Sequence, residues 1–132
     1  MDKKIGLFWL RDDFRLTKNN GLIEATINHD HVVVFYLYKK DTYKDQEAQK
    51  WWLSRSLLNF RKQLINLNIN LEIIETNSFK IFFDTLIKKK DFSIYWNKVY
   101  EPDYLKFDEY LLSTFKNKNI YHKRFKGNSL NE

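Results

Sequence analysis

Two short polar segments of the sequence carry the side chains best suited to bind a ligand. Residues 11–15 read R-D-D-F-R, and residues 97–103 read N-K-V-Y-E-P-D. Carboxylates such as Glu101 and Asp103 can accept hydrogen bonds from the N–H groups of a fused heterocycle, while guanidinium groups pair with carboxylates. The two segments therefore indicate either a ligand site or a network of ion pairs.

A scaffold role competes with ligand binding for each of these charges. Arg11, Asp13 and Arg15 can form ion pairs that fix their loop and hold a neighbouring helix, and we favour this interpretation over direct ligand contact. Asp103 follows Pro102, a residue that starts helices well, and a carboxylate in the first turn stabilises a helix through its macrodipole. Asp103 thus fits a helix start and a ligand contact equally well.

Other common chemistries find no support in the sequence. Residues 11–15 contain no glycine, which excludes a dinucleotide fingerprint and a P-loop there. Ser54 and Ser56 fall in a helical pattern without a G-x-S-x-G motif, and the chain has no cysteine. Three histidines are expected at the surface rather than on a metal ion: His29, His31 and His122. We therefore predict no catalytic residue and no metal site.

Alternating strand and helix patterns must position the two polar segments. Strands are expected at residues 5–10, 32–38, 69–73, 92–96 and 120–125. Helices are expected at residues 21–28, 47–67 and 79–87, and from residue 102 onward. The apolar residues of these helices recur three and four positions apart, as on one face of a helix. The first helix should bury Leu22, Ile23 and Ile27. The second should bury a face that ends at Leu67.

The most apolar strands belong in the middle of the sheet. The first, second and fourth expected strands are nearly continuous apolar runs, whereas the third alternates and the fifth is polar. We therefore predict a Rossmann-like α/β fold, a five-stranded parallel sheet in the order 3-2-1-4-5 with helices on both faces. The order reverses between the first and fourth strands, where such sheets bind ligands, and residues 10–15 and 97–103 frame that point.

Composition limits the cellular setting. The 132 residues suffice for one domain, and neither a signal peptide nor an apolar run of about 18 residues is present, so we expect a cytoplasmic protein without membrane contact. The formal net charge of +6 could attract nucleic acid. We favour a simpler explanation, the Lys-, Asn- and Ile-rich composition that is typical of AT-rich genomes.

Four tryptophans divide into two pairs. Trp9 and Trp96 lie in expected central strands, which favours core packing over electron transfer. Trp51 and Trp52 are adjacent on a helix and point about 100° apart, so at least one of them lies near the surface and indicates an interface.

Three motifs together resemble a known family. Residues 8–16 read F-W-L-R-D-D-F-R-L and, with Asn19, resemble the opening W-F-R-x-D-L-R-x-x-D-N signature of DNA photolyases and cryptochromes. Residues 95–102 read Y-W-N-K-V-Y-E-P and resemble the Y-E-P segment of that family, with Asp108 further along. Residues 125–132 resemble its F-x-G-x-x-L-x-E-P segment. The order is preserved, although Lys18 stands where the family usually has an aspartate.

The resemblance implies the N-terminal domain of such a protein. Residues 1–126 would form this domain, and residues 127–132 would begin the linker to a helical domain that is missing here. In the family that second domain holds the FAD, the electron-relay tryptophans and the pocket for the DNA lesion. The chain alone is therefore expected to be inactive and free of FAD, to reach DNA only through its full-length parent, and to self-associate through the face left uncovered.

The resemblance also implies an antenna pigment. Family members hold methenyltetrahydrofolate, or a deazaflavin or flavin, and pass its excitation energy to FAD. The candidate contacts in this chain are Tyr43, Glu101, Asp103 and Tyr104. Tyr43 occupies roughly the place of a histidine in folate-binding members, and Asp103 and Tyr104 occupy the places of an asparagine and a glutamate.

Several functions follow from these observations. The leading hypothesis is the light-harvesting domain of a deoxyribodipyrimidine photolyase, whose parent repairs UV-induced pyrimidine dimers with light. The alternatives are a cryptochrome-type blue-light receptor domain, a stand-alone module that binds nucleotides or nucleic acid, and an interaction domain without a ligand.

Overall fold

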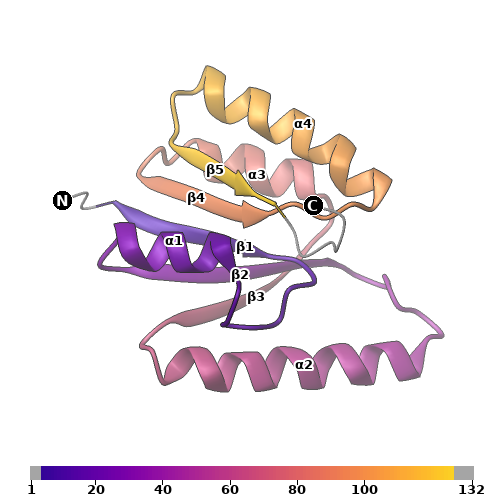
Figure 1. Cartoon of the computed structure of the whole chain (residues 1–132). Helices are drawn as coiled ribbons and strands as arrows, with labels where there is room; N and C mark the ends of the chain where they lie inside the picture. The colour runs from indigo at the N-terminus through magenta and orange to yellow at the C-terminus, as the bar shows by residue number, and fades with distance from the viewer. Residues whose placement is uncertain (1–3, 127–132) are drawn as a thin grey trace.

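A computed structural model describes residues 4–126 of the chain, in which strands and helices alternate (Figure 1). The strands are β1 (Ile5–Leu10), β2 (Val32–Lys39), β3 (Asn70–Thr76), β4 (Phe92–Asn97) and β5 (His122–Phe125). The helices are α1 (Asn20–Asn28), α2 (Glu47–Ile65), α3 (Phe79–Ile87) and α4 (Pro102–Asn117). The linker predicted at residues 127–132 lies outside the described residues.

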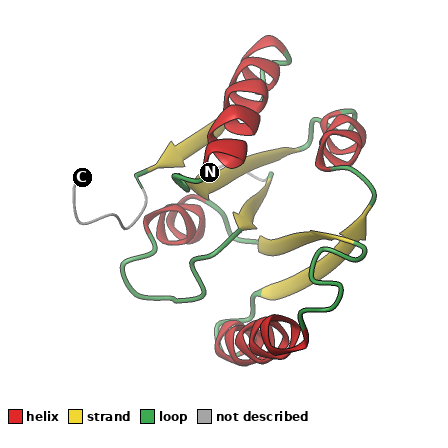
Figure 2. Cartoon of the chain, turned by 90° about the vertical axis from the view of Figure 1, so that its right-hand side faces the viewer, coloured by secondary structure: helices red, strands yellow, loops and turns green. Residues whose placement is uncertain are grey.

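The five strands form one parallel sheet in the order β3-β2-β1-β4-β5, which confirms the predicted topology. β1 lies at the centre, where Leu7 pairs with Val33 of β2 and with Ile94 of β4. Helices α1 and α2 cover one face of the sheet, and α3 and α4 cover the other (Figure 2). The strand order reverses between β1 and β4, so the loops after these two strands meet at the carboxyl edge of the sheet.

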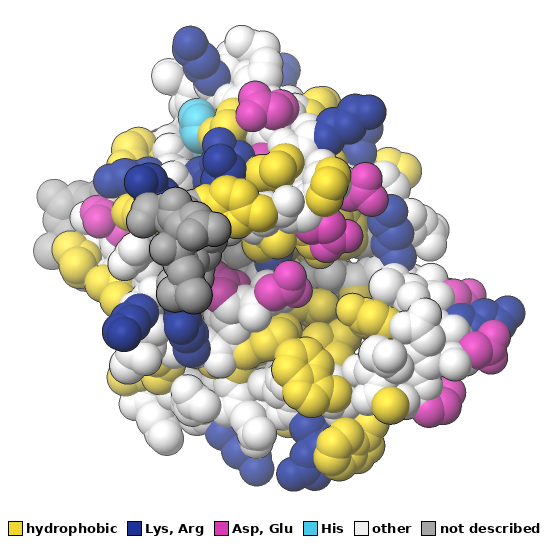
Figure 3. Space-filling model, turned by 45° about the vertical axis from the view of Figure 1, so that its right-hand side comes forward, with side chains coloured by type: hydrophobic (Ala, Val, Ile, Leu, Met, Phe, Trp, Pro, Cys, Tyr) yellow, Lys and Arg dark blue, Asp and Glu magenta, His cyan; other side chains and the backbone are white. Residues whose placement is uncertain are grey.

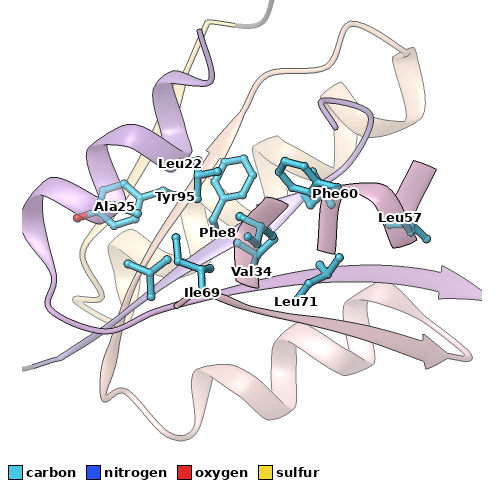
Figure 4. Packing of buried hydrophobic residues seen from close by; sticks show 12 residues of the cluster. Phe8, Leu22, Ala25, Val34, Leu57, Phe60, Ile69, Leu71 and Tyr95 are labelled. Carbon is cyan, nitrogen blue, oxygen red and sulfur yellow. The ribbon is translucent and has the colours of Figure 1, made fainter. Parts of the chain in front are cut away.

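Each face of the sheet buries its own apolar cluster. Side chains alternate along a strand, so Phe8 and Leu10 of β1 enter the cluster under α1 and α2, while Trp9 enters the cluster under α3 and α4. Figure 4 shows the first cluster, in which Phe60 of α2 lies over the sheet near Phe8 and Val34. All six residues of β4 are buried, as a strand covered on both faces requires.

The face that α1 buries differs from the prediction. Leu22 is buried as predicted, together with Gly21 and Ala25, whereas Ile23 and Ile27 are exposed, the latter at 71%. The reason is close approach: a Cβ added to Gly21 would lie only 2.8 Å from the side-chain oxygen of Asn97 at the end of β4. Small residues therefore decide which side of α1 meets the sheet.

Two further predictions were wrong. Helix α2 ends at Ile65 and Leu67 is exposed, because Asn68 adopts a left-handed conformation (φ 59°) that turns the chain toward β3. His29 is buried rather than exposed. Its ring nitrogens lie 2.9 Å from a backbone carbonyl oxygen and 2.9 Å from the hydroxyl oxygen of Tyr95.

The tryptophans lie as predicted. Trp9 and Trp96 are buried in the core, and Trp51 and Trp52 are both exposed on α2, at 63% and 59%. Within residues 4–126, no helix has the length and apolar character needed to cross a membrane.

Candidate functional site

A hollow of about 590 Å³ opens at the carboxyl edge of the sheet. It lies where the loop after β1, the end of β2 and the first turns of α3 and α4 come together. Figure 3 views the molecule from this side, with acidic side chains beside exposed hydrophobic ones. The hollow is lined by Asp12, Tyr36, Leu37, Tyr38, Lys39, Thr42, Tyr43, Ser78, Phe79, Lys80, Glu101, Asp103, Tyr104 and Phe107. Its volume is that of a small-molecule pocket.

The structure brings all four predicted pigment contacts into this hollow. Tyr43 comes from the loop between β2 and α2. Glu101 is the N-cap residue of α4 and has an extended backbone (φ −63°, ψ 131°), and Pro102 then begins the helix. Asp103 and Tyr104 follow in the first turn. The side chain of Glu101 does not cap the helix, so its carboxylate can accept hydrogen bonds from a ligand.

Sequence reasoning missed several residues that line the same hollow. Asp12 belongs to the polar segment after β1, but its neighbours Asp13 and Arg15 were singled out instead. Tyr36 lies near the end of β2, and Phe79 starts α3. The signal was available, because a parallel sheet brings the carboxyl ends of its strands to one edge.

Burial raises the pKa of two tyrosines of the hollow, Tyr104 and Tyr36. It raises the pKa of Tyr104 to about 12, and the nearby charge of Asp12 contributes to that shift. Both phenols therefore keep their O–H donors at neutral pH.

Asp12 lies at the rim of the hollow. Part of its surface is exposed, yet the crowding around its carboxyl group raises its pKa, and the negative charge of Asp13 raises it further. The ionised form of Asp12 is therefore less stable than that of an isolated aspartate.

Arg11 does not point into the hollow but lies buried behind it. Its guanidinium donates to both carboxylate oxygens of Asp108 on α4, at 2.9 and 3.2 Å, and to the backbone oxygen of Asn97 at 2.5 Å. Asp108 also accepts a hydrogen bond from Arg124 of β5, at 3.2 Å. This buried network joins the loop after β1 to α4 and to the edge of the sheet.

A second polar network fixes the same loop to β4. The side-chain nitrogen of Asn97 donates to the Asp13 carboxylate and to the side-chain oxygen of Asn19, the latter at 2.7 Å. The side-chain oxygen of Asn97 accepts from the N–H of Gly21 at 2.9 Å. Asn19 caps α1 by accepting from the N–H of Leu22 at 3.2 Å. In the sequence Asn19 stands out only as part of a family motif, and nothing there indicates this role for Asn97.

Arg15 takes a different position from Arg11 and Asp13. Its side chain lines a second, shallower hollow of about 480 Å³ beside Phe14 and Trp52, which meet edge to face at 6.1 Å. Asp12 and Asp13 line this hollow too, so Asp12 lies between the two. In the described part of the chain, no three side chains of His, Cys, Asp or Glu are placed so that they could hold a metal ion.

A third hollow, of about 450 Å³, adjoins the first. The two share Tyr36, Tyr38 and Tyr43, and the third continues between β2 and α2 along Leu53 and Leu57. A ligand in the first hollow therefore has apolar space behind Tyr43.

The chain forms a domain of the doubly wound α/β class, with a hollow of small-molecule size at the switch point and no glycine in the loop after β1. The model of the DNA photolyase family matches residues 6–132, and the chain belongs to that family. The resemblance that three motifs carry is thereby confirmed. A comparison with curated proteins gives no match.

Solved structures that share the fold include two photolyases. A class III photolyase from Agrobacterium tumefaciens superposes with a TM-score of 0.81 at 24% sequence identity, over 96% of this chain and 26% of its own. An archaeal photolyase from Sulfolobus tokodaii, described with two FAD molecules and a novel light-harvesting cofactor, superposes with a TM-score of 0.77 at 22% identity. That match covers 92% of this chain and 29% of the archaeal protein. The chain thus spans about a quarter of the length of the photolyases that it matches.

Proposed function

We propose that this chain is the light-harvesting domain of a deoxyribodipyrimidine photolyase and binds an antenna pigment in the 590 Å³ hollow. The observation that carries the proposal is the convergence of Tyr43, Glu101, Asp103 and Tyr104 on that hollow at the switch point of the sheet. Membership of the DNA photolyase family supports it. The light-harvesting cofactor of the archaeal neighbour is consistent with it.

The chemistry of the hollow fits a flat heterocycle with N–H donors. Glu101 and Asp103 offer carboxylate acceptors, and aromatic walls such as Tyr104 and Phe107 offer faces for ring stacking. Methenyltetrahydrofolate and a flavin or deazaflavin all have such rings. We therefore propose one of these pigments as the ligand.

The remaining steps belong to the parent protein. In this proposal the pigment passes its excitation energy to FAD held by another domain, and the parent repairs pyrimidine dimers in DNA in the cytoplasm. The chain alone has no repair activity in this scheme. An assay of thymine-dimer reversal under near-ultraviolet light tests this point, and activity of the purified chain would contradict it.

Titration of pigment into the chain tests the binding step. Methenyltetrahydrofolate, flavin mononucleotide and a deazaflavin are added separately, and pigment fluorescence reports binding. A charge-assisted hydrogen bond contributes roughly 1.5–3 kcal/mol, so Glu101→Gln should weaken binding by about ten- to a hundredfold. Glu109→Gln is the matched control, because Glu109 is exposed on α4 and does not line the hollow. Equal affinity in Glu101→Gln would remove Glu101 from the site, and no binding of any pigment would contradict the proposal.

A further inference from the structure

The guanidinium of Arg11 contacts two aromatic rings, those of Trp9 and Tyr104, which also contact each other edge to face. Its central carbon is 4.7 Å from the ring centroid of Trp9 and 4.9 Å from that of Tyr104. Arg11 is 2% exposed, so water does not screen these contacts. Cation–π contacts of this kind strengthen when they are desolvated.

One side of this arrangement is fixed by the core. Trp9 is buried and meets Phe83 at 5.0 Å and Phe107 at 6.0 Å, both edge to face. The guanidinium plane is fixed as well, because Asp108 accepts two hydrogen bonds from it. The side chains of Trp9 and Arg11 are thus held in place behind the ring of Tyr104.

The other side of the arrangement faces the hollow. Tyr104 lines the hollow and lies one helical turn before Asp108, so Arg11 contacts the tyrosine and holds the carboxylate on the same face of α4. Among residues 4–126, no hydrogen bond holds the Tyr104 hydroxyl. The orientation of its ring therefore depends on the rings and the guanidinium behind it.

We propose that Arg11 is a positioning residue of the pigment site: it acts through Tyr104 and fixes the plane of the ring against which the pigment binds. This inference rests on the proposed function, and it gives Arg11 a role beyond holding α4 to the loop after β1. Arg11 itself does not touch the ligand.

A matched pair of arginine variants separates positioning from scaffolding. Arg11→Lys and Arg124→Lys both keep a positive charge near Asp108 and both weaken hydrogen bonding to it. Only Arg11 contacts Tyr104, and it also donates to the backbone oxygen of Asn97. A lost planar contact of about 0.5–2 kcal/mol predicts that Arg11→Lys weakens pigment binding about two- to thirtyfold. Arg124→Lys should change the affinity by less than about twofold. Equal losses in the two variants would overturn the proposal. Circular dichroism verifies that each variant folds.

A double-mutant cycle with Tyr104→Leu tests the route of the effect. If Arg11 acts through Tyr104, Arg11→Lys weakens pigment binding in the natural chain but has little further effect once Tyr104 is leucine. Effects that multiply in full would show that Arg11 acts independently of Tyr104, and the proposal would be wrong.

The resonances of isotope-labelled tyrosines give a readout that needs no pigment. The ring centroids of Trp9 and Tyr104 lie 6.2 Å apart, so the ring current of Trp9 shifts the NMR signals of the Tyr104 ring. Arg11→Lys should move or broaden these signals, and Arg124→Lys should not. If the natural chain binds no pigment, the proposed function fails and this spectrum still decides whether Arg11 orders Tyr104. Unchanged Tyr104 signals in Arg11→Lys would overturn the inference even if pigment binds.

Discussion

The two walls of the hollow are held in different ways. The wall formed by the loops after β1 and β4 is tied by side-chain bonds between distant residues, such as Arg11 with Asp108 and Asn97 with Asp13. The wall formed by residues 40–46 carries Tyr43. Among the described residues it has only short-range turn hydrogen bonds, for example from the N–H of Gln46 to the backbone oxygen of Tyr43 at 2.9 Å.

Backbone conformation sharpens the contrast. Asp41 and Asp45 flank Tyr43, and both have positive φ angles, of 66° and 64°. The first wall therefore cannot change without exposing or unpairing buried polar groups, whereas the second can change with the loss of a few local bonds. The fold itself therefore sets the shape of the Glu101 side of the hollow, while the Tyr43 side depends on a single loop.

The largest effect is expected from removing the carboxylate of Asp108 on α4, which holds Arg11 of the first wall. Asp108→Ala leaves Arg11 charged and buried without its partner, which should lower the free energy of unfolding by about 3–5 kcal/mol. Urea denaturation measures the change. Glu109→Gln, on the exposed side of the same helix, is the control and should have little effect. A loss below about 1 kcal/mol in Asp108→Ala would mean that the network does not hold this wall.

A smaller loss is expected where α1 meets the first wall. In Gly21→Ala the new Cβ would lie 2.8 Å from both Asn97 Oδ1 and Phe8 Cε1, so α1 or these two side chains must shift. Overpacking of this kind costs about 1–3 kcal/mol, more than alanine gains from its helix propensity. Thermal unfolding monitored by circular dichroism measures it. Unchanged or greater stability would show that α1 is free to move off β4.

The second wall should respond weakly to substitution. Asp45→Gly removes a side chain from a left-handed position and should change stability by less than about 1 kcal/mol, with a gain from relieved strain offset by the freedom of glycine in the unfolded chain. Urea denaturation of this variant measures the change in the free energy of unfolding. A loss as large as that expected for Asp108→Ala would show that the two walls are equally constrained.

The smallest effect concerns pH and the rim residue Asp12. Its pKa in the folded chain is raised above 3.8, so folding favours the protonated form and stability falls as the pH rises from near 3.8 through the folded pKa. Asp12→Asn should therefore raise the melting temperature near neutral pH and leave it almost unchanged below about pH 3, where the carboxyl is protonated in both states. An equal rise at both pH values would assign the change to packing rather than to charge.

The strand order could be predicted from the sequence because burial alone distinguishes central strands from edges. The apolar β1 and β4 had to be covered on both faces, and the polar β5 had to be an edge. The buried face of α1 could not be predicted in the same way. Hydrophobicity favoured Ile23 and Ile27, but the fit of Gly21 against the end of β4 decided the outcome.

The site was predictable only in part. Glu101 was found because it is a carboxylate that follows the fourth strand, and Tyr104 because it occupies the place of a glutamate in members of the family. Topology would have added Asp12 and Tyr36. The contact of Arg11 with the Trp9 and Tyr104 rings has no sequence signal, because it depends on distances between side chains of different elements.

The central place of β1 has a consequence for synthesis of the protein on the ribosome. Gly6 finds its partner Val32 in β2 soon after it is made, but on the other side Ile5 pairs with Phe92, which is translated 87 residues later. At about 5–20 residues per second, the second edge of β1 waits on the order of 4–17 s for β4. During that interval an apolar strand with unpaired N–H and C=O groups lies open to other nascent chains. The loop that follows β1 lines the hollow, so the strand that positions this loop is also one whose pairing is completed late in synthesis.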